Sequence, residues 1–242
     1  MQGLTAKEIL SLWEAGQYQT PAERALTLLS TFIPQTPRDA LERMSIGKRD
    51  ELLLMFRELL FGSQFTATAT CPHCRSLLDL GFNAAELRTE MPDVQLETFA
   101  TTVGEYQFNC RLPASHDLLA VRHATDTQEI AAVLFARCVR QTNGDEVELM
   151  SLPEAVSEAV VAEIARCDPQ ADIRFELVCP DCAHEWEAIF DIVSFAWNEL
   201  SAWAGRLLRQ VHTLARAYGW SEAQILALSS FRRQMYLEML EQ

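Results

Sequence analysis

Cys71-Pro72-His73-Cys74 and Cys179-Pro180-Asp181-Cys182 are two copies of one pattern in a chain of 242 residues. Two residues between paired cysteines let both thiolates reach one metal ion from a tight turn, and two such turns complete a tetrahedral site of four sulfurs. Thiolate ligands in this geometry suit zinc. The sequence therefore predicts one structural Zn2+ held by Cys71, Cys74, Cys179 and Cys182, with no open position for catalysis.

The segments beside each cysteine pair predict a β-hairpin. They alternate apolar and polar residues or are rich in residues that favour strands. When the two copies are aligned on their cysteines, Phe82 matches Phe190, and Asn83 matches Asp191 as the N-cap of a following helix. We therefore expect two copies of one hairpin knuckle that share a metal across a pseudo-twofold axis. The four expected strands are 64–70, 77–82, 173–178 and 186–190.

Other states of the cysteine pairs stay open, namely empty or relic knuckles, disulfides and a redox pair. A redox pair of the thioredoxin type needs a βαβ context, and each pair here lies in a predicted hairpin. His73 and His184 lie beside the pairs and are either substitute ligands or bystanders. The three remaining cysteines stand alone between apolar residues, so we expect buried small hydrophobic side chains. They are Cys110, Cys138 and Cys167.

Composition and charge limit the class of protein. Apolar residues make up 49% and charged residues 22% of the chain, which is enough apolar material for a globular core. The net charge of −14 argues against nonspecific binding to nucleic acid. Residues 203–242 carry five Arg and three Glu, so this tail is mildly basic on an acidic body. No secretory signal and no membrane span are visible, and we expect a soluble protein of the cytosol in which it is made.

Helices are predicted on both sides of the first knuckle. Residues 21–32 read as a short helix, and Ser45 precedes an amphipathic helix that closes at Gly62. A core stripe is expected on this second helix. Its members are Leu52, Leu53, Phe56, Leu59 and Leu60.

The region between the knuckles reads as an α+β insertion. A hairpin is expected from strands 94–100 and 105–112 around Thr102-Val103-Gly104-Glu105. Pro113-Ala114-Ser115 is expected to cap a helix over 116–123. Two further helices follow at 127–141 and 153–167, separated by a turn at Asn143-Gly144.

The C-terminal part predicts one long helix over 192–218 and two short ones that begin at Ser221 and Ser230. Gly219 supplies the helix stop. The long helix carries a stripe that needs a partner surface. Its members are Leu200, Trp203, Leu207, Val211, Leu214 and Tyr218.

These elements predict an α+β fold with a split zinc-ribbon-like core. The expected division is an N-terminal segment 1–37, a core region 38–191 and a C-terminal helical module 192–242. Within the core region, the knuckles occupy about 62–83 and 172–191, and the insertion occupies 92–168.

No catalytic motif is present in the sequence. GxxxxGK[ST], GxGxxG, GxSxG and HExxH are all absent. The adjacent pairs His116-Asp117 and His184-Glu185 are expected to be solvated surface residues. We therefore predict that the protein is not an enzyme.

Four segments in order resemble the T4-type family of phage baseplate proteins, described as baseplate hub assembly chaperones of contractile tails and related injection systems. The resemblance spans about residues 38–240. The segments are IGKRDELLLMFRELLFG (46–62), the LPxxxDLL element (112–119), FELVCPDCAHEWEAIFDIVSFAWNEL (175–200) and VHTLARAYGWSEAQILALSSFRRQMYLEML (211–240).

The resemblance implies a role in building the baseplate hub through contacts with other baseplate or tail proteins, without catalysis. We expect no nucleic acid, membrane or small-molecule substrate as a partner, and a location in the cytoplasm of the producing bacterial cell or in the finished particle. For Tyr218 and Trp220, packing between the terminal helices is the competing interpretation. The candidate docking residues are Trp203, Tyr218, Trp220, Arg232, Arg233 and Tyr236.

Two other functions compete with this one. A nucleic-acid-binding or transcription-associated zinc-ribbon protein also carries paired CPxC knuckles, but the net charge and the absence of a basic, aromatic stretch count against it. A zinc-dependent enzyme needs an open coordination position, which four cysteines do not leave.

Overall fold

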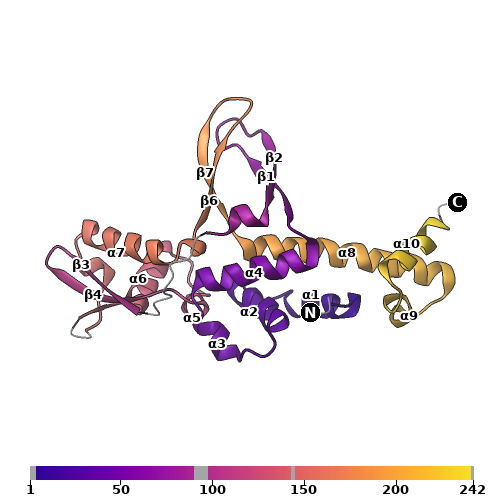
Figure 1. Ribbon diagram of the computed structural model, residues 1–242, viewed down its shortest axis with the longest axis horizontal. Coiled ribbons are helices and arrows are strands. Elements are labelled where there is room, and N and C mark those ends of the chain that lie inside the picture. The colour runs from indigo at the N-terminus through magenta and orange to yellow at the C-terminus, as the bar shows by residue number, and fades with distance from the viewer. Residues whose placement is uncertain (1–3, 90–97, 143–144, 241–242) are drawn as a thin grey trace. The chain divides into compact units, whose positions relative to one another are not determined.

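The computed structural model describes residues 4–89, 98–142 and 145–240 (Figure 1). The chain forms two compact units, one of Thr20–Val193 and one of Met1–Gln19 with Ser194–Gln242. The expected N-terminal segment 1–37 is therefore divided, because its first helix belongs with the C-terminal helices. None of the described helices combines the length and the apolar composition that crossing a bilayer requires.

The larger unit begins with three helices, α2 (Pro21–Phe32), α3 (Arg38–Arg43) and α4 (Ile46–Phe61). Thr20 and Glu23 form a capping box at the start of α2, and Pro21 occupies its first turn. The hydroxyl of Ser45 accepts a hydrogen bond from the backbone N–H of Lys48, and Gly62 ends α4 with a φ of 88°. The helices expected at 21–32 and after Ser45 are thus confirmed, and the second ends at Gly62 as expected.

The buried face of α4 differs from the expected stripe. Leu53 and Phe56 are buried as expected, but Leu59 is 47% exposed and Leu54 is buried instead. Helix α4 packs against α2 and the short 3-10 helix η3 (Pro169–Ala171), and its buried residues also include Arg49, Asp50 and Arg57. Apolar periodicity alone could not place these three residues, because they are charged.

Two β-hairpins stand at either end of the insertion, and Figure 1 shows them side by side. They share one register, because Phe65 opposes Phe82 in the first hairpin and Ile173 opposes Phe190 at the matching positions of the second. The strands are β1 (Gln64–Thr70), β2 (Leu77–Asn83), β6 (Ile173–Val178) and β7 (Glu185–Phe190). The repeated knuckle expected from the sequence is confirmed at the level of the backbone.

Aromatic rings fill the space between the two hairpins. The ring of Phe82 lies 4.9 Å from that of Phe175 and 5.6 Å from that of Phe190, centroid to centroid. Phe65 reaches Phe190 at 6.0 Å, and the guanidinium carbon of Arg57 lies 3.7 Å from the Phe65 ring centroid. These contacts join the hairpins to one another and to α4.

The caps expected after each hairpin are also present. The side chain of Asn83 accepts a hydrogen bond from the backbone N–H of Ala85 at the start of η1 (Ala84–Leu87). The side chain of Asp191 accepts one from Val193 at the start of α8 (Ile192–Tyr218).

The insertion contains a three-stranded antiparallel sheet in the order β3-β4-β5. The described strands are β3 (Thr98–Val103), β4 (Tyr106–Arg111) and β5 (Val139–Gln141), and the helices are α5 (Ser115–Ala120), α6 (Thr127–Cys138) and α7 (Glu154–Cys167), with η2 (Leu149–Ser151) before α7. Phe108, Val139 and Val160 are buried in one core that the sheet shares with α6 and α7. The expected strand residues 94–97 and the expected turn at Asn143-Gly144 lie outside the described residues.

Three expected boundaries in the insertion were wrong. The helix expected over 127–141 ends at Cys138, because the next three residues pair with β4 as strand β5. Strand β3 continues to Val103, where a turn was expected. Helix α5 ends at Ala120 rather than at His123, and the Asp117 carboxylate caps it at Ala114.

The smaller unit packs α1 (Ala6–Ala15) against α8, followed by α9 (Glu222–Leu226) and α10 (Ser230–Glu238). Helix α8 has the expected bounds. Leu10 of α1 packs with Ala204 and Leu207, so the α8 stripe finds its partner surface within the chain. Gly219 ends the helix with a φ of 70°.

Candidate metal centre

Each cysteine pair lies in a tight turn at the tip of its hairpin. In the first turn, the backbone N–H of Cys71 donates to the carbonyl of Ser76 (2.9 Å), and that of Arg75 donates to Cys71 (3.0 Å). In the second turn, Cys179 donates to His184 and Ala183 donates to Cys179, both at 2.9 Å. Each turn is therefore closed by an equivalent pair of backbone hydrogen bonds.

The same backbone conformation recurs in both turns. Arg75 and Ala183 are the two non-glycine residues with positive φ in the described chain, at 67° and 57°. Each directly follows the second cysteine of its pair, so this residue folds the chain back toward the next strand.

The two turns bring four sulfur atoms together, all within 4.8 Å of one another. Across the hairpins, the Sγ atoms of Cys71 and Cys182 lie 3.7 Å apart, and those of Cys74 and Cys179 lie 3.5 Å apart. The pseudo-twofold relation exchanges these two pairs, because it maps Cys71 onto Cys179 and Cys74 onto Cys182. The four cysteines can therefore hold one metal ion between the hairpins.

The cluster fits zinc in both spacing and ligand chemistry. A Zn–S bond of about 2.3 Å places the corners of a tetrahedron about 3.8 Å apart, close to the two distances across the hairpins. All four cysteines are free thiols, with Cys71 and Cys179 buried, Cys182 half-buried and Cys74 exposed. Four thiolates leave no position for a substrate, so such a site has a structural role.

Serine and histidine side chains surround the cluster without joining it. Hydrogen bonds with the side chain and the backbone of Ser76 lower the pKa of Cys74 to about 6. The pKa of Cys182 rises to about 12 despite a hydrogen bond with the backbone of His184, because burial and the other three cysteines disfavour its thiolate. The rings of His73 and His184 stack with their centroids 5.5 Å apart, and Trp186 continues the stack at 6.1 Å from His184. In the described chain, the cysteines are the one group of three or more potential ligands that meets at a point.

The isolated cysteines lie elsewhere. Cys110 and Cys138 are buried in the core of the insertion, and burial raises the pKa of each thiol to about 11. The expectation of small hydrophobic side chains is confirmed for these two. Cys167 is half-buried at the end of α7.

A second polar centre was missed by the sequence analysis. Asp117 was expected on a solvated surface, but its side chain is fully buried. Both terminal nitrogens of Arg111 donate to its carboxylate at 2.7 Å, and Nε of Arg137 donates at 2.6 Å. Burial raises the pKa of Asp117, but the hydrogen bonds from the two arginines and from Ala114 outweigh burial and lower it to about 2. No local motif signals this centre, since the arginines come from β4 and α6.

The candidate docking residues all lie in the smaller unit. Tyr218, Trp220 and Tyr236 pack against one another, with ring centroids 4.7 to 5.6 Å apart. Arg233 is only 5% exposed and donates to the carbonyl of Leu228 at 2.6 Å.

The other two candidates differ in exposure. Trp203 is half-buried against the cluster that contains Leu10, whereas Arg232 is exposed. Docking by any of the six remains a prediction.

The two hairpin knuckles flank an α+β insertion in the sequence and meet at the four-cysteine cluster. The chain is therefore a mixed α+β protein with a candidate metal centre. The family described as T4 bacteriophage base plate protein matches residues 3–197, and the chain belongs to this family. The match includes both knuckles and the N-terminal residues that the resemblance left unplaced, and it ends inside α8. No curated protein and no solved structure matches the chain.

Proposed function

We propose that this protein is a non-enzymatic component or assembly chaperone of the baseplate hub in a contractile phage tail or a related injection system. The observation that carries the proposal is the family match over residues 3–197. The four-cysteine cluster supports a role without catalysis, because a site closed by four thiolates leaves no position for a substrate.

The proposed cofactor is one structural Zn2+ at Cys71, Cys74, Cys179 and Cys182. The hairpins that carry these residues enclose the whole insertion between them in the sequence. When bound, the ion would fasten the two ends of the insertion to each other, so the binding free energy would add to folding stability. A rigid platform of this kind suits a protein that presents surfaces to partners.

The proposed partners are other baseplate or tail proteins. The proposed location is the cytoplasm of the producing cell, and a resident component would also be retained in the finished particle. Aromatic and arginine side chains are enriched among interface hot spots. The proposed docking residues are Trp203, Tyr218, Trp220, Arg232, Arg233 and Tyr236. No observation favours the nucleic-acid-binding alternative, and the net charge of −14 opposes it.

Deletion of the gene from the phage or prophage that carries it tests the proposal. Electron microscopy of the lysate should show tails or baseplates without a completed hub, and a plasmid copy of the gene should restore them. Normal, infectious particles from the deletion strain would refute a hub role. Mass spectrometry of purified particles then separates a chaperone, which is absent from them, from a resident component.

A further inference from the structure

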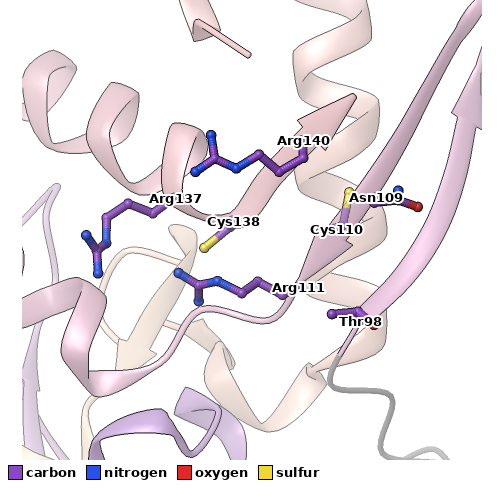
Figure 2. Close-up of a pocket in the computed structure, with 7 residues that line it drawn as sticks. All are labelled: Thr98, Asn109, Cys110, Arg111, Arg137, Cys138 and Arg140. Carbon is purple, nitrogen blue, oxygen red and sulfur yellow. The ribbon is translucent and has the colours of Figure 1, made fainter. Parts of the chain in front are cut away.

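The insertion carries a pocket of about 420 Å³ that the proposed function does not use (Figure 2). Three arginines from three elements line it, Arg111 of β4, Arg137 of α6 and Arg140 of β5. Thr98 and Asn109 add a hydroxyl and an amide to the lining. Figure 2 shows Arg111 and Arg137 extended to the same side of the strands.

The register of the sheet explains why the four lining residues that lie on strands share one face. Thr98 lies opposite Arg111, and Asn109 lies opposite Arg140. Residues directly opposite one another in an antiparallel sheet point to the same side, as do residues two apart in one strand. The other side of the sheet, with Phe108 and Val139, is buried in the core.

The face is basic in an acidic protein. Strands β3, β4 and β5 contain two arginines and neither Asp nor Glu, whereas the whole chain has a net charge of −14. Two carboxylates from outside the strands partly neutralise the three arginines, Asp117 and Glu146. The three arginines and the two carboxylates together therefore keep one positive charge.

Several hydrogen-bond donors of the arginines have no partner in the described part of the chain. Arg137 uses its Nε for Asp117, which leaves its two terminal amino groups. Nη1 of Arg140 lies 2.8 Å from a carboxylate oxygen of Glu146, but this buried nitrogen makes no hydrogen bond, and the Glu146 side chain is 81% exposed. Exposed ion pairs contribute little stability, so an incoming anion can replace Glu146 at small cost.

We propose that this pocket binds an aspartate or glutamate side chain of a partner protein. Asp117 holds Arg111 by two hydrogen bonds and Arg137 by one, which fixes the guanidinium groups in place before a ligand arrives. Guanidinium groups bind carboxylates through paired, charge-assisted hydrogen bonds. The site rests on its own contacts and is independent of a role in hub assembly.

A protein carboxylate fits the pocket better than a nucleic acid does. Nucleic acid requires a long basic surface that neutralises several phosphates. Here the surplus is one charge, and the surrounding protein is strongly acidic. A single acidic side chain matches that surplus.

The test is a titration of the 15N-labelled full chain, followed through the Nε–Hε signals of its arginines. The probes are a blocked tetraglutamate peptide and a blocked tetraglutamine peptide, at one ionic strength because salt screens such contacts. We expect saturable shifts at Arg137 and Arg140 with tetraglutamate alone. The variant Arg140→Gln should weaken binding by roughly threefold to fivefold.

Two further variants complete the test. Glu146→Gln should tighten binding, because it frees Arg140. Arg166→Gln removes another exposed arginine that is paired with a glutamate, on α7, and should leave binding unchanged. Three results would each overturn the proposal. The first is an equal effect of Arg140→Gln and Arg166→Gln on binding, and the second is equal signal shifts with tetraglutamine. The third is tighter binding of a single-stranded DNA than of tetraglutamate at the same arginines. If Arg140→Gln does not fold, a Glu146→Gln variant without tighter binding overturns it.

Discussion

The Sγ atoms of Cys74 and Cys179 lie 3.5 Å apart, although 105 positions separate the two residues in the chain. Cys71 and Cys182 form the matching pair at 3.7 Å. The ends of the insertion therefore meet at one point, and four thiols crowded there are stable as thiolates only when a cation balances their charge.

Metal content provides the first prediction. Protein purified without a tag should contain about one zinc ion per chain, and Cys179→Ser should lose the metal and lower the urea midpoint, because binding energy contributes to folding. Elemental analysis and urea unfolding measure the two effects. Cys167→Ser, which changes a half-buried cysteine outside the cluster, should keep the zinc. The metal site would be refuted if the wild-type protein contained no zinc and were only as stable as Cys179→Ser.

The aromatic core between the hairpins provides the second prediction. Phe82→Ala should lower stability by about 3 to 5 kcal/mol, because the ring contacts Phe65, Phe175 and Phe190. The matched control is Ile189→Ala in the second hairpin, where the side chain is 71% exposed and little change is expected. Chemical denaturation of both variants measures the difference, and equal losses would show that the hairpins do not form a shared core.

Gly47, in the first turn of α4, provides the third prediction. A Cβ at this position would lie 1.9 Å from Oδ1 of Asp168, whose Oδ2 accepts a hydrogen bond from the Gly47 N–H at 2.9 Å. Gly47→Ala should therefore destabilise the larger unit by about 1 to 3 kcal/mol.

Gly205 of α8 is the control for this substitution, because a Cβ there meets nothing within 4 Å. Gly205→Ala should stabilise the helix by up to about 1 kcal/mol. Thermal unfolding of the two variants should give shifts of opposite sign, and a neutral Gly47→Ala would disprove the close packing of α4 on Asp168.

Asp117 provides the fourth prediction, which concerns pH. Its pKa is about 2 in the folded protein and about 3.9 in an unfolded chain. Its contribution to stability is therefore fully present above pH 4 and is lost as the pH falls toward 2. Asp117→Asn should cost about 3 kcal/mol near neutral pH, because it leaves two arginines without their counter-charge. The stability gap between variant and wild type, followed by urea unfolding, should narrow below pH 4, and a gap independent of pH would contradict the charge pairing.

Asp50 should show the opposite pH dependence. Burial, with smaller contributions from Asp191 and Asp168, raises its pKa to about 6 despite the neighbouring Arg49. Its contribution to stability is present below pH 4 and is lost as the pH rises through 6. Asp50→Asn should remove this loss between pH 4 and 6, whereas Asp117→Asn should leave it in place.

The adjacent arginines of α10 provide the fifth prediction. Arg233→Ala should lower stability by about 1 to 3 kcal/mol, because the buried guanidinium donates to the carbonyl of Leu228 and to the side chain of Gln210. Arg232→Ala should leave stability unchanged, since that side chain is exposed. If the smaller unit docks on a hub protein, Arg232→Ala should weaken the complex in a pull-down. Equal stability losses would show that both arginines are structural.

The sequence by itself determined most of the local structure and the candidate metal centre. Capping residues such as Ser45 and Asn83 marked where helices begin, and α8 has the bounds that its periodicity and Gly219 predicted. The repeated CPxC pattern placed both turns and brought four sulfurs to one point. Caps and turns were predictable because they depend on residues a few positions apart, and the meeting of the two distant cysteine pairs was predictable because two pairs of thiolates complete one zinc site.

Only the tertiary structure decided which surfaces meet. It buried Asp117 between Arg111 and Arg137, turned the end of a predicted helix into β5, and exposed Leu59 while burying Leu54. A strand forms where an open sheet edge offers hydrogen bonds, and a charged side chain is buried where distant partners satisfy it. Neither condition can be read from neighbouring residues, because the partners come from elements far apart in the chain.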